Sequence, residues 1–249
     1  MYVLKKIGKT TFPFLKKLGT YNLSICSENS FIIHSRSYGE TSVIFDVITE
    51  NIGLYSLLGK GIKKKKDFSS LQPFKELKLT FSNKKNLPIL SKYEIINTFQ
   101  VSKNNLILYG MYMNELIYKF IPQREPCISL YKLYKYQLNN MSDNRVSLDL
   151  QLLKFEILFL KEIGYEITSA ISKEEISDSK NYYYQYDSGF KEVNNKLDLN
   201  LSITGGDLKL LIGNSIHNIS KVNSLRSIVR NIFQRLLGTK KIMSYELFD

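Results

Sequence analysis

The sequence predicts an α+β fold with two parts, an N-terminal β-barrel followed by an α-helical domain that carries a small β-rich insertion. Three observations lead to this prediction. Short segments rich in β-branched residues come first, apolar residues then recur at helical spacing, and a polar, tyrosine-rich stretch interrupts the helical pattern. The expected parts are a basic arm at 1–24, a barrel at 25–101 and a helical domain at 102–249, with the insertion at about 166–204.

The barrel part is expected to contain five short strands separated by turn signals, of which Glu50–Gly53 is the clearest. β-branched and aromatic residues dominate these segments, and such residues fit the pleated surface of a sheet. Five strands in so short a stretch favour a small closed barrel, and the OB-fold is the common five-stranded kind. A β-sandwich accounts for the same pattern and stays open. The expected strands are Phe31–His34, Thr41–Thr49, Leu54–Leu58, Lys78–Phe81 and Leu87–Ile96.

Helical periodicity dominates the rest of the chain. The strongest pattern spans Leu148–Ile163, and Gly164 stands where a C-terminal cap belongs. The polar stretch that follows contains an Asp187-Ser188-Gly189 turn, which predicts a hairpin insertion. The expected helices are 106–120 (stopped by Pro122), 128–138, 148–163, 206–212 and 220–237 (stopped by Gly238).

Composition and charge limit the kind of partner. The chain has 249 residues, 43% of them hydrophobic, which is enough to bury a sizeable core. Its net charge of +12 favours polyanionic partners such as nucleic acid or an anionic membrane surface. Lys, Glu or Asn interrupts every apolar run before it reaches bilayer length, so we expect no membrane insertion.

Cysteine usage and the basic arm bear on the compartment. Cys26 and Cys127 are the two cysteines and form no C-x-x-C pair, which excludes a disulfide scaffold and a cysteine zinc site of the usual spacing. A reducing cytoplasm is therefore expected. Residues 1–24 hold five lysines and no acid, and Pro13 breaks their apolar patches too early for a secretion signal. We expect a loosely ordered basic arm, unless these residues precede the true start codon.

Motifs for catalysis do not emerge from the sequence. Gly8-Lys9-Thr10 resembles the tail of a phosphate-binding P-loop, but Val3 stands where the first glycine belongs. His34 and His217 fall in different predicted parts, and no nucleophile elbow accompanies them. We therefore expect a protein that is not an enzyme and that carries no cofactor or metal.

A run of lysines is the most prominent candidate for a binding site. It lies on a glycine-containing loop that follows an expected barrel strand, and such a loop can track a phosphate backbone without reading bases. The alternative is a solvated loop with no partner. Two further lysines at another barrel turn extend the same surface. The residues are Lys60, Lys63, Lys64, Lys65 and Lys66, with Lys84 and Lys85 at the second turn.

A second basic stripe is expected on the last helix. Arg226, Arg230 and Arg235 fall at intervals of four and five residues, near one exposed face of that helix. Such arginines either contact nucleic acid or merely keep the surface soluble, and both interpretations stay open.

Several segments together resemble the RecO family. Phe31–Phe74 is similar to the N-terminal OB domain of that family, through an S-R-x-x-x-E-T-S run that contains Arg36, a Lys-Gly pair with a basic tail, and a closing L-Q-P-F. Leu108–Leu116 resembles the first long helix of the family, and Lys154–Tyr165 resembles its F-E…L-G-Y segment. The pattern L-G…K…S…L over 237–247 is similar to the end of the family sequence.

The resemblance implies a bacterial DNA-repair and recombination mediator. Such a protein binds single- and double-stranded DNA, with Arg36 and the lysines in contact with it, and anneals complementary strands coated by single-strand-binding protein. It acts with RecR, assists RecA loading and associates with the nucleoid. Many relatives carry a four-cysteine zinc site in the insertion, but 166–191 contains no cysteine, so a metal-free hairpin is expected here.

The resemblance also implies contact between the helical domain and the acidic, hydrophobic tail of single-strand-binding protein. Such a tail ends in a carboxylate beside an aromatic residue, so its receptor needs a cation next to an apolar pocket. Lys154 and Phe155 offer that pairing, with Arg145 and Tyr165 near the two ends of the same helix. The alternative is that Phe155 belongs to the core. For the whole chain, a non-catalytic adaptor that bridges repair partners and an OB-type RNA-binding protein are the rival functions.

Overall fold

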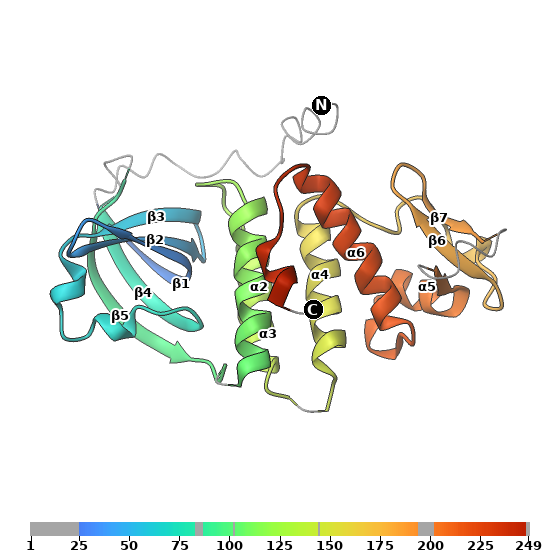
Figure 1. Ribbon diagram of the computed structural model, residues 1–249, viewed down its shortest axis with the longest axis horizontal. Coiled ribbons are helices and arrows are strands. Elements are labelled where there is room, and N and C mark those ends of the chain that lie inside the picture. Colours follow the sequence, from blue (N-terminus) through green and yellow to red (C-terminus); the bar gives the residue numbers. More distant parts are fainter. Residues whose placement is uncertain (1–24, 83–86, 102, 144, 194–201, 248–249) are drawn as a thin grey trace.

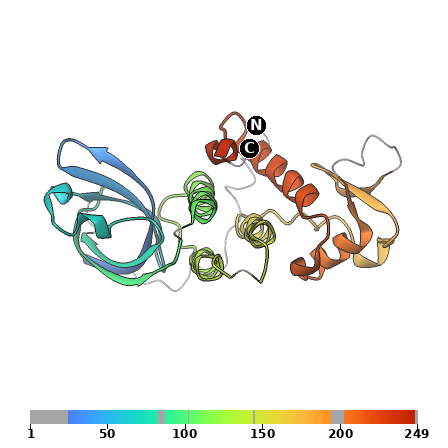
Figure 2. The ribbon, with the colours of Figure 1, turned by 60° about the horizontal axis from the view of Figure 1, so that its bottom comes forward.

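The expected α+β class is confirmed, and its parts lie in a row. The larger sheet stands at one end, the helices in the middle and a small sheet at the other end (Figures 1 and 2). The basic arm at 1–24, Lys84 and Lys85 lie outside the described residues. The computed structural model describes residues 25–82, 87–101, 103–143, 145–193 and 202–247.

Five antiparallel strands form the larger sheet, in the order β3-β2-β1-β4-β5. Each expected strand overlaps one of them. The first is much longer than predicted at both ends, because Ile25–Ser30 pair with β4 and Ser35–Tyr38 pair with β2 without a clear hydrophobic pattern in either segment. The strands are β1 Ile25–Tyr38, β2 Ser42–Thr49, β3 Gly53–Gly59, β4 Lys75–Ser82 and β5 Leu90–Thr98.

This sheet is not closed into a barrel, which corrects the prediction. β3 and β5 are its edges, and among the described residues their backbone contact consists of Leu58 N donating to Pro88 O (2.7 Å) and a bridge between Leu58 and Ile89. Pro88 has no N–H to donate, so a continuous ladder cannot run through this point. A sandwich is not formed by these strands either, since all five belong to one sheet.

The helices follow the predicted bounds closely. At the start of α4, Ser147 Oγ accepts a hydrogen bond from Leu150 N (3.4 Å), which caps the helix. At its end, Gly164 takes the left-handed conformation expected of a capping glycine (φ 82°). The helices are α2 Asn104–Phe120, α3 Ile128–Asn140, α4 Leu148–Glu162, α5 Gly205–Ile212 and α6 Val222–Leu237.

Strand β2 is buried on both faces, because it lies between two hydrophobic cores. Phe45 and Val47 face an inner core to which all five strands contribute, so the sheet curls around it. Ile48 points the other way and joins Phe31 of β1 in the core of the helices. The Phe31 ring lies 5.2 Å from that of Tyr131 and 5.0 Å from that of Tyr134, both on α3. The sheet and the helices therefore share one packed boundary.

The insertion forms a small lobe of three strands in the order β7-β6-β8, and the predicted hairpin turn at Asp187–Gly189 joins the first two. Tyr182, Phe190 and Ile203 are buried and belong to the same core as the helices. The strands are β6 Asn181–Gln185, β7 Gly189–Glu192 and β8 Ser202–Thr204.

Replacing Phe31 with Ala should destabilise the sheet and the helices together. The substitution removes a fully buried ring from their shared boundary and should lower the free energy of unfolding by about 3–5 kcal/mol. Urea unfolding followed by tyrosine fluorescence and far-ultraviolet circular dichroism measures this loss. Ile96→Ala, on the exposed part of β5, serves as the control and should change stability by less than about 0.5 kcal/mol. A loss below about 1 kcal/mol in the Phe31 variant would contradict the shared boundary.

Candidate nucleic-acid interface

The lysine loop, residues 60–66, joins β3 to the segment before β4 and is anchored to the sheet. Ile62 is the reason, because its side chain is only 2% exposed and packs into the inner core of the sheet. Gly61, in the left-handed region (φ 64°), donates its N–H to Ser42 Oγ (3.0 Å). Lys63 N donates to Thr41 O (3.0 Å). These bonds fix the loop against the β1–β2 hairpin.

The ammonium groups of this loop lie on its outer side. Lys60, Lys64 and Lys66 are exposed. Lys63 is half-buried and donates from Nζ to Ser37 Oγ on β1 (3.0 Å). Lys65 is exposed, and its Nζ lies 5.3 Å from the centre of the Tyr93 ring. The loop lies on the side of the sheet away from α4 and α6 (Figures 1 and 2).

Arg36 lies near this loop and is held at the surface by a buried acid. The carboxylate of Asp46, only 1% exposed, accepts hydrogen bonds from Arg36 Nη1 and from Ser56 Oγ. Nδ1 of His34 lies 3.2 Å from the same carboxylate. The His34 ring also stacks on Tyr118 of α2, with 4.9 Å between ring centres. The S-R motif of the sequence analysis thus places a fixed guanidinium on β1, one residue before the Ser37 that Lys63 contacts. Asp46 itself gave no sequence signal.

The predicted exposure of the arginine stripe on α6 is wrong for Arg226 and right for Arg235. Arg226 is 7% exposed, and its guanidinium lies 2.5 Å from Asp149 and 3.5 Å from Glu156. Arg230 is half-buried, with its guanidinium 5.1 Å from the Tyr245 ring centre. Arg235 is exposed but lies 4.0 Å from the ring centre of Tyr186 in the lobe. The fully buried Glu156 explains the first position, since a buried carboxylate requires a cation nearby.

The residues expected to receive an acidic tail do not form one site. Phe155 is fully buried in the helical core, which corrects its assignment to a surface pocket. Arg145 stands before α4 and Tyr165 beyond its end, so a helix length of roughly 22 Å separates them. Tyr165 instead shares a hydrogen bond with Tyr184 of the lobe (2.7 Å between hydroxyl oxygens).

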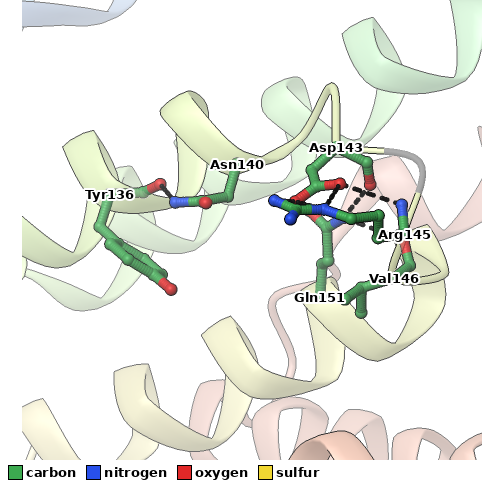
Figure 3. A network of polar contacts seen from close by, with 6 residues as sticks. All are labelled: Tyr136, Asn140, Asp143, Arg145, Val146 and Gln151. Carbon is green, nitrogen blue, oxygen red and sulfur yellow. Dashed lines mark hydrogen bonds and ion pairs between the residues drawn. The ribbon is translucent and has the colours of Figure 1, made fainter.

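The turn between α3 and α4 holds one of the expected cations at the surface (Figure 3). Arg145 is 89% exposed and binds Asp143 through two nitrogens, at 2.7–3.1 Å. Gln151 Nε2 donates to the carbonyl oxygens of Asp143 (3.1 Å) and Val146 (3.0 Å), which fixes this turn. These contacts hold Arg145 in place.

Lys154 of α4 lies near an aromatic side chain of α3 that the sequence analysis missed. Its Nζ is 5.4 Å from the ring centre of Tyr136, and that tyrosine is 52% exposed. This pair is the combination of cation and apolar surface that the sequence analysis had assigned to Phe155. Lys132, one turn before Tyr136 on the same helix, is also exposed.

Two carboxyl groups of the helical part have pKa values shifted in opposite directions. Burial is the largest influence on Glu156 and raises its pKa above the ordinary 4.5, despite the nearby Arg226 charge. Burial also acts on Glu115, but hydrogen bonds from Ser244 and Met243 outweigh it and lower the pKa below 4.5. Glu115 connects α2, and Glu156 connects α4, to the C-terminal part of the chain.

Within the described ranges, no three side chains of His, Cys, Asp or Glu gather closely enough to hold a metal ion. No helix among these residues is long and apolar enough to cross a bilayer.

Two family models match the chain. Residues 23–99 match "Recombination protein O N terminal", and residues 104–238 match "Recombination protein O C terminal". Together they define a two-part DNA-repair protein. The chain belongs to the RecO family.

Curated relatives agree with this assignment. The chain is 26% identical over 223 residues to the DNA repair protein RecO of Pseudoalteromonas translucida (strain TAC 125), which covers 88% of this chain and 95% of the relative. Identity to the RecO of Proteus mirabilis (strain HI4320) is 27%, over 89% of this chain and 91% of the relative. Identity to that of Klebsiella pneumoniae (strain 342) is 28%, with the same coverage.

Substitution of Glu156 by Gln should change how stability depends on pH. Because the pKa of Glu156 is raised in the folded state, its contribution to stability is present below about pH 4.5 and is lost as the pH rises through the folded value. The stability of the parent relative to Glu156→Gln should therefore fall over this range. Urea unfolding at a series of pH values measures the difference.

Glu115→Gln provides a control with the opposite sign. Its carboxyl has a lowered pKa, so its contribution is present above about pH 4.5 and is lost as the pH falls through the folded value. The parent should gain stability relative to this variant as the pH rises. If the stability of the parent relative to each variant changed with pH in the same direction, the prediction of opposite pKa shifts for the two carboxyls would be wrong.

Proposed function

We propose that this protein is a non-catalytic recombination mediator that binds single- and double-stranded DNA and anneals complementary strands coated by single-strand-binding protein. It acts with RecR, assists RecA loading and works at the nucleoid in the cytoplasm. The observation that carries the proposal is the lysine loop, which is bonded to the same β1–β2 hairpin that holds the guanidinium of Arg36. An OB-type sheet is part of the proposal, and five antiparallel strands around one inner core support it.

Annealing requires no group that makes or breaks bonds. Two strands repel each other through their phosphates, and a basic surface screens that repulsion while it raises the local strand concentration. The lysine loop contains no acid, and Lys84 and Lys85 add charge in the β4–β5 connection. Arg226 takes no part in this surface, because its charge is committed to Asp149 and Glu156. Arg230 adds to the positive electrostatic potential at the surface but does not contact the DNA directly.

We also propose that the acidic tail of single-strand-binding protein docks over Tyr136 and Lys154. The ring supplies apolar surface for the terminal aromatic residue, while the ammonium group faces the tail carboxylate. Arg145 and Lys132 add positive charge along α3 and the turn. Docking there leaves the lysine loop open, because the loop lies on the other side of the sheet (Figures 1 and 2).

Replacing Lys63, Lys64, Lys65 and Lys66 together with Ala should weaken DNA binding and slow the annealing of precoated strands. The slope of log affinity against log salt should flatten by about 0.7 for each phosphate of the single strand that the protein no longer neutralises. Fluorescence anisotropy over a salt series measures the slope, and an RNA strand of the same sequence tests the RNA-binding rival.

A matched variant separates local contact from total charge. Lys161, Lys173, Lys191 and Lys240 are exposed and lie outside the loop, so replacing these four with Ala changes the net charge equally. Equal slopes of log affinity against log salt for the two quadruple variants would mean that the loop lysines act only through the total charge and solubility of the protein. Failure of the intact protein to anneal precoated strands would favour the adaptor.

Lys154→Ala and Tyr136→Ala should each weaken binding of a labelled acidic peptide that ends in an aromatic residue and a free carboxylate. Lys161→Ala is the matched control, because Lys161 lies on the same helix and pairs with Glu166 instead of a ring (3.7 Å). Anisotropy with the full chain measures each affinity. Equal loss of affinity in Lys154→Ala and Lys161→Ala would rule out the Tyr136–Lys154 surface.

A further inference from the structure

Three side chains form a row on one face of β1, called the β1 row: His34, Arg36 and Tyr38. Alternate residues of a strand point to the same side, and neighbours in the row are about 6.8 Å apart. Their partners across β2 are Asp46, Ile44 and Ser42, in that order. The row begins where α2 packs against the sheet and ends at the tip of the β1–β2 hairpin.

Tyr38 differs from the other ring of this row in having no partner for its face. The His34 ring is occupied by Tyr118. Tyr38 is 55% exposed, and in the described part of the chain its ring stacks on no other ring and carries no cation above it. A large ring in water at the tip of a hairpin contributes little to the core, so its surface is open to a ligand.

We propose that Tyr38 is a stacking platform for a base of single-stranded nucleic acid, with Arg36 placed to meet the adjoining backbone. The proposal rests on the nucleic-acid binding proposed above and adds a contact to bases, which the lysines do not make. It commits to a single strand, because the faces of bases inside a duplex are already covered by their neighbours.

Several contacts hold the backbone on either side of Tyr38 in place. Gly39 turns the hairpin immediately after it, in the left-handed region (φ 64°). Ser37, on its other side, accepts a hydrogen bond from Lys63 Nζ (3.0 Å), and Ser42 opposite it accepts one from Gly61 N (3.0 Å). The lysine loop is thus bonded to both neighbours of the platform. Because the backbone that carries the ring is fixed in advance, a base that stacks on Tyr38 has to order only the side-chain torsions of that residue.

The guanidinium of Arg36 is also held in place before a strand binds. The buried carboxylate of Asp46 holds its guanidinium, so the cation stands one step along the row from the Tyr38 ring. Asp46, already bonded, and Glu40 in the hairpin turn are the two acids of the segment from His34 to Thr49. The lysine loop meets the hairpin at Ser42 and Ser37, and Ser37 faces the opposite side of β1 from the row. The loop therefore adds positive potential at the tip end of the row, which suits an anionic backbone that passes from the loop onto the row.

A base stacked on Tyr38 competes with base pairing. While the strand is single, stacking holds it; when the complementary strand pairs with it, the base returns to a helical stack and leaves the ring. The platform therefore favours single strands at the start of annealing and releases the duplex at its end.

The test compares Tyr38→Ala, Tyr38→Phe and the quadruple lysine-loop variant on three probes of equal length: a single DNA strand, the same strand made entirely of abasic sites, and a duplex. Tyr38→Ala should bind the normal strand about 5- to 100-fold more weakly and bind the abasic strand and the duplex unchanged. Tyr38→Phe keeps the ring and should behave as the parent. A 2-aminopurine base in the strand should be quenched by the parent and not by Tyr38→Ala.

The outcomes separate this proposal from the one on which it rests. An equal loss of affinity on normal and abasic strands, or no loss on any probe, would overturn the stacking role even if the lysine-loop variant weakens all three. Weaker binding confined to the normal strand in Tyr38→Ala, with an unaffected lysine-loop variant, would support stacking and overturn the role of the loop. Urea unfolding checks that Tyr38→Ala stays folded, as expected for an exposed side chain.

Discussion

The packing of one sheet between two cores is the constraint on which the molecule depends. Strand β2 has no face left for water, since Phe45 and Val47 fill the inner core and Ile48 meets the helices. Phe31 of the neighbouring strand carries that second contact into α3. Because one side of the sheet is occupied in this way, the hairpin tip, the lysine loop and the exposed strand β5 are among the parts of it that can meet a large partner.

Two arginines are each paired with a buried carboxylate. Asp46 lies under the sheet surface and holds Arg36 outward, where its guanidinium is still nearly half exposed. Glu156 lies deep among the helices and holds Arg226 inward. Both arginines are paired, yet only the first can meet a polyanion. Both acids are buried, so the place of the arginine in the fold makes the difference: Arg36 stands on the exposed end of a strand, and Arg226 stands on the core-facing side of a helix.

This contrast also explains what could be predicted from the sequence. The helix at 148–162 follows from its apolar spacing and its capping Gly164, because both signals are local. Barrel closure could not be predicted, since it depends on how β3 approaches the segment around Pro88, far away in sequence. The long end of β1 was missed because Ser35–Tyr38 are held by pairing and carry no hydrophobic pattern.

The residues of the candidate site also divide into those with a local sequence signal and those whose surroundings depend on distant parts of the chain. The lysine loop and Arg36 were recognisable from residue type and order, and both lie at the surface. Phe155 was misassigned because periodicity tells that a residue is on a face without telling which face is buried. Tyr38 and Tyr136 gave no signal, since an isolated tyrosine has no pattern and its exposure depends on distant neighbours.

The lobe formed by β6, β7 and β8 is held by aromatic packing. Tyr184 meets Phe190 edge to face (5.1 Å between ring centres), and Arg235 of α6 covers Tyr186. Among the described residues of the lobe these contacts include no thiol and no cluster of metal ligands, so neither chelation nor thiol oxidation would loosen them.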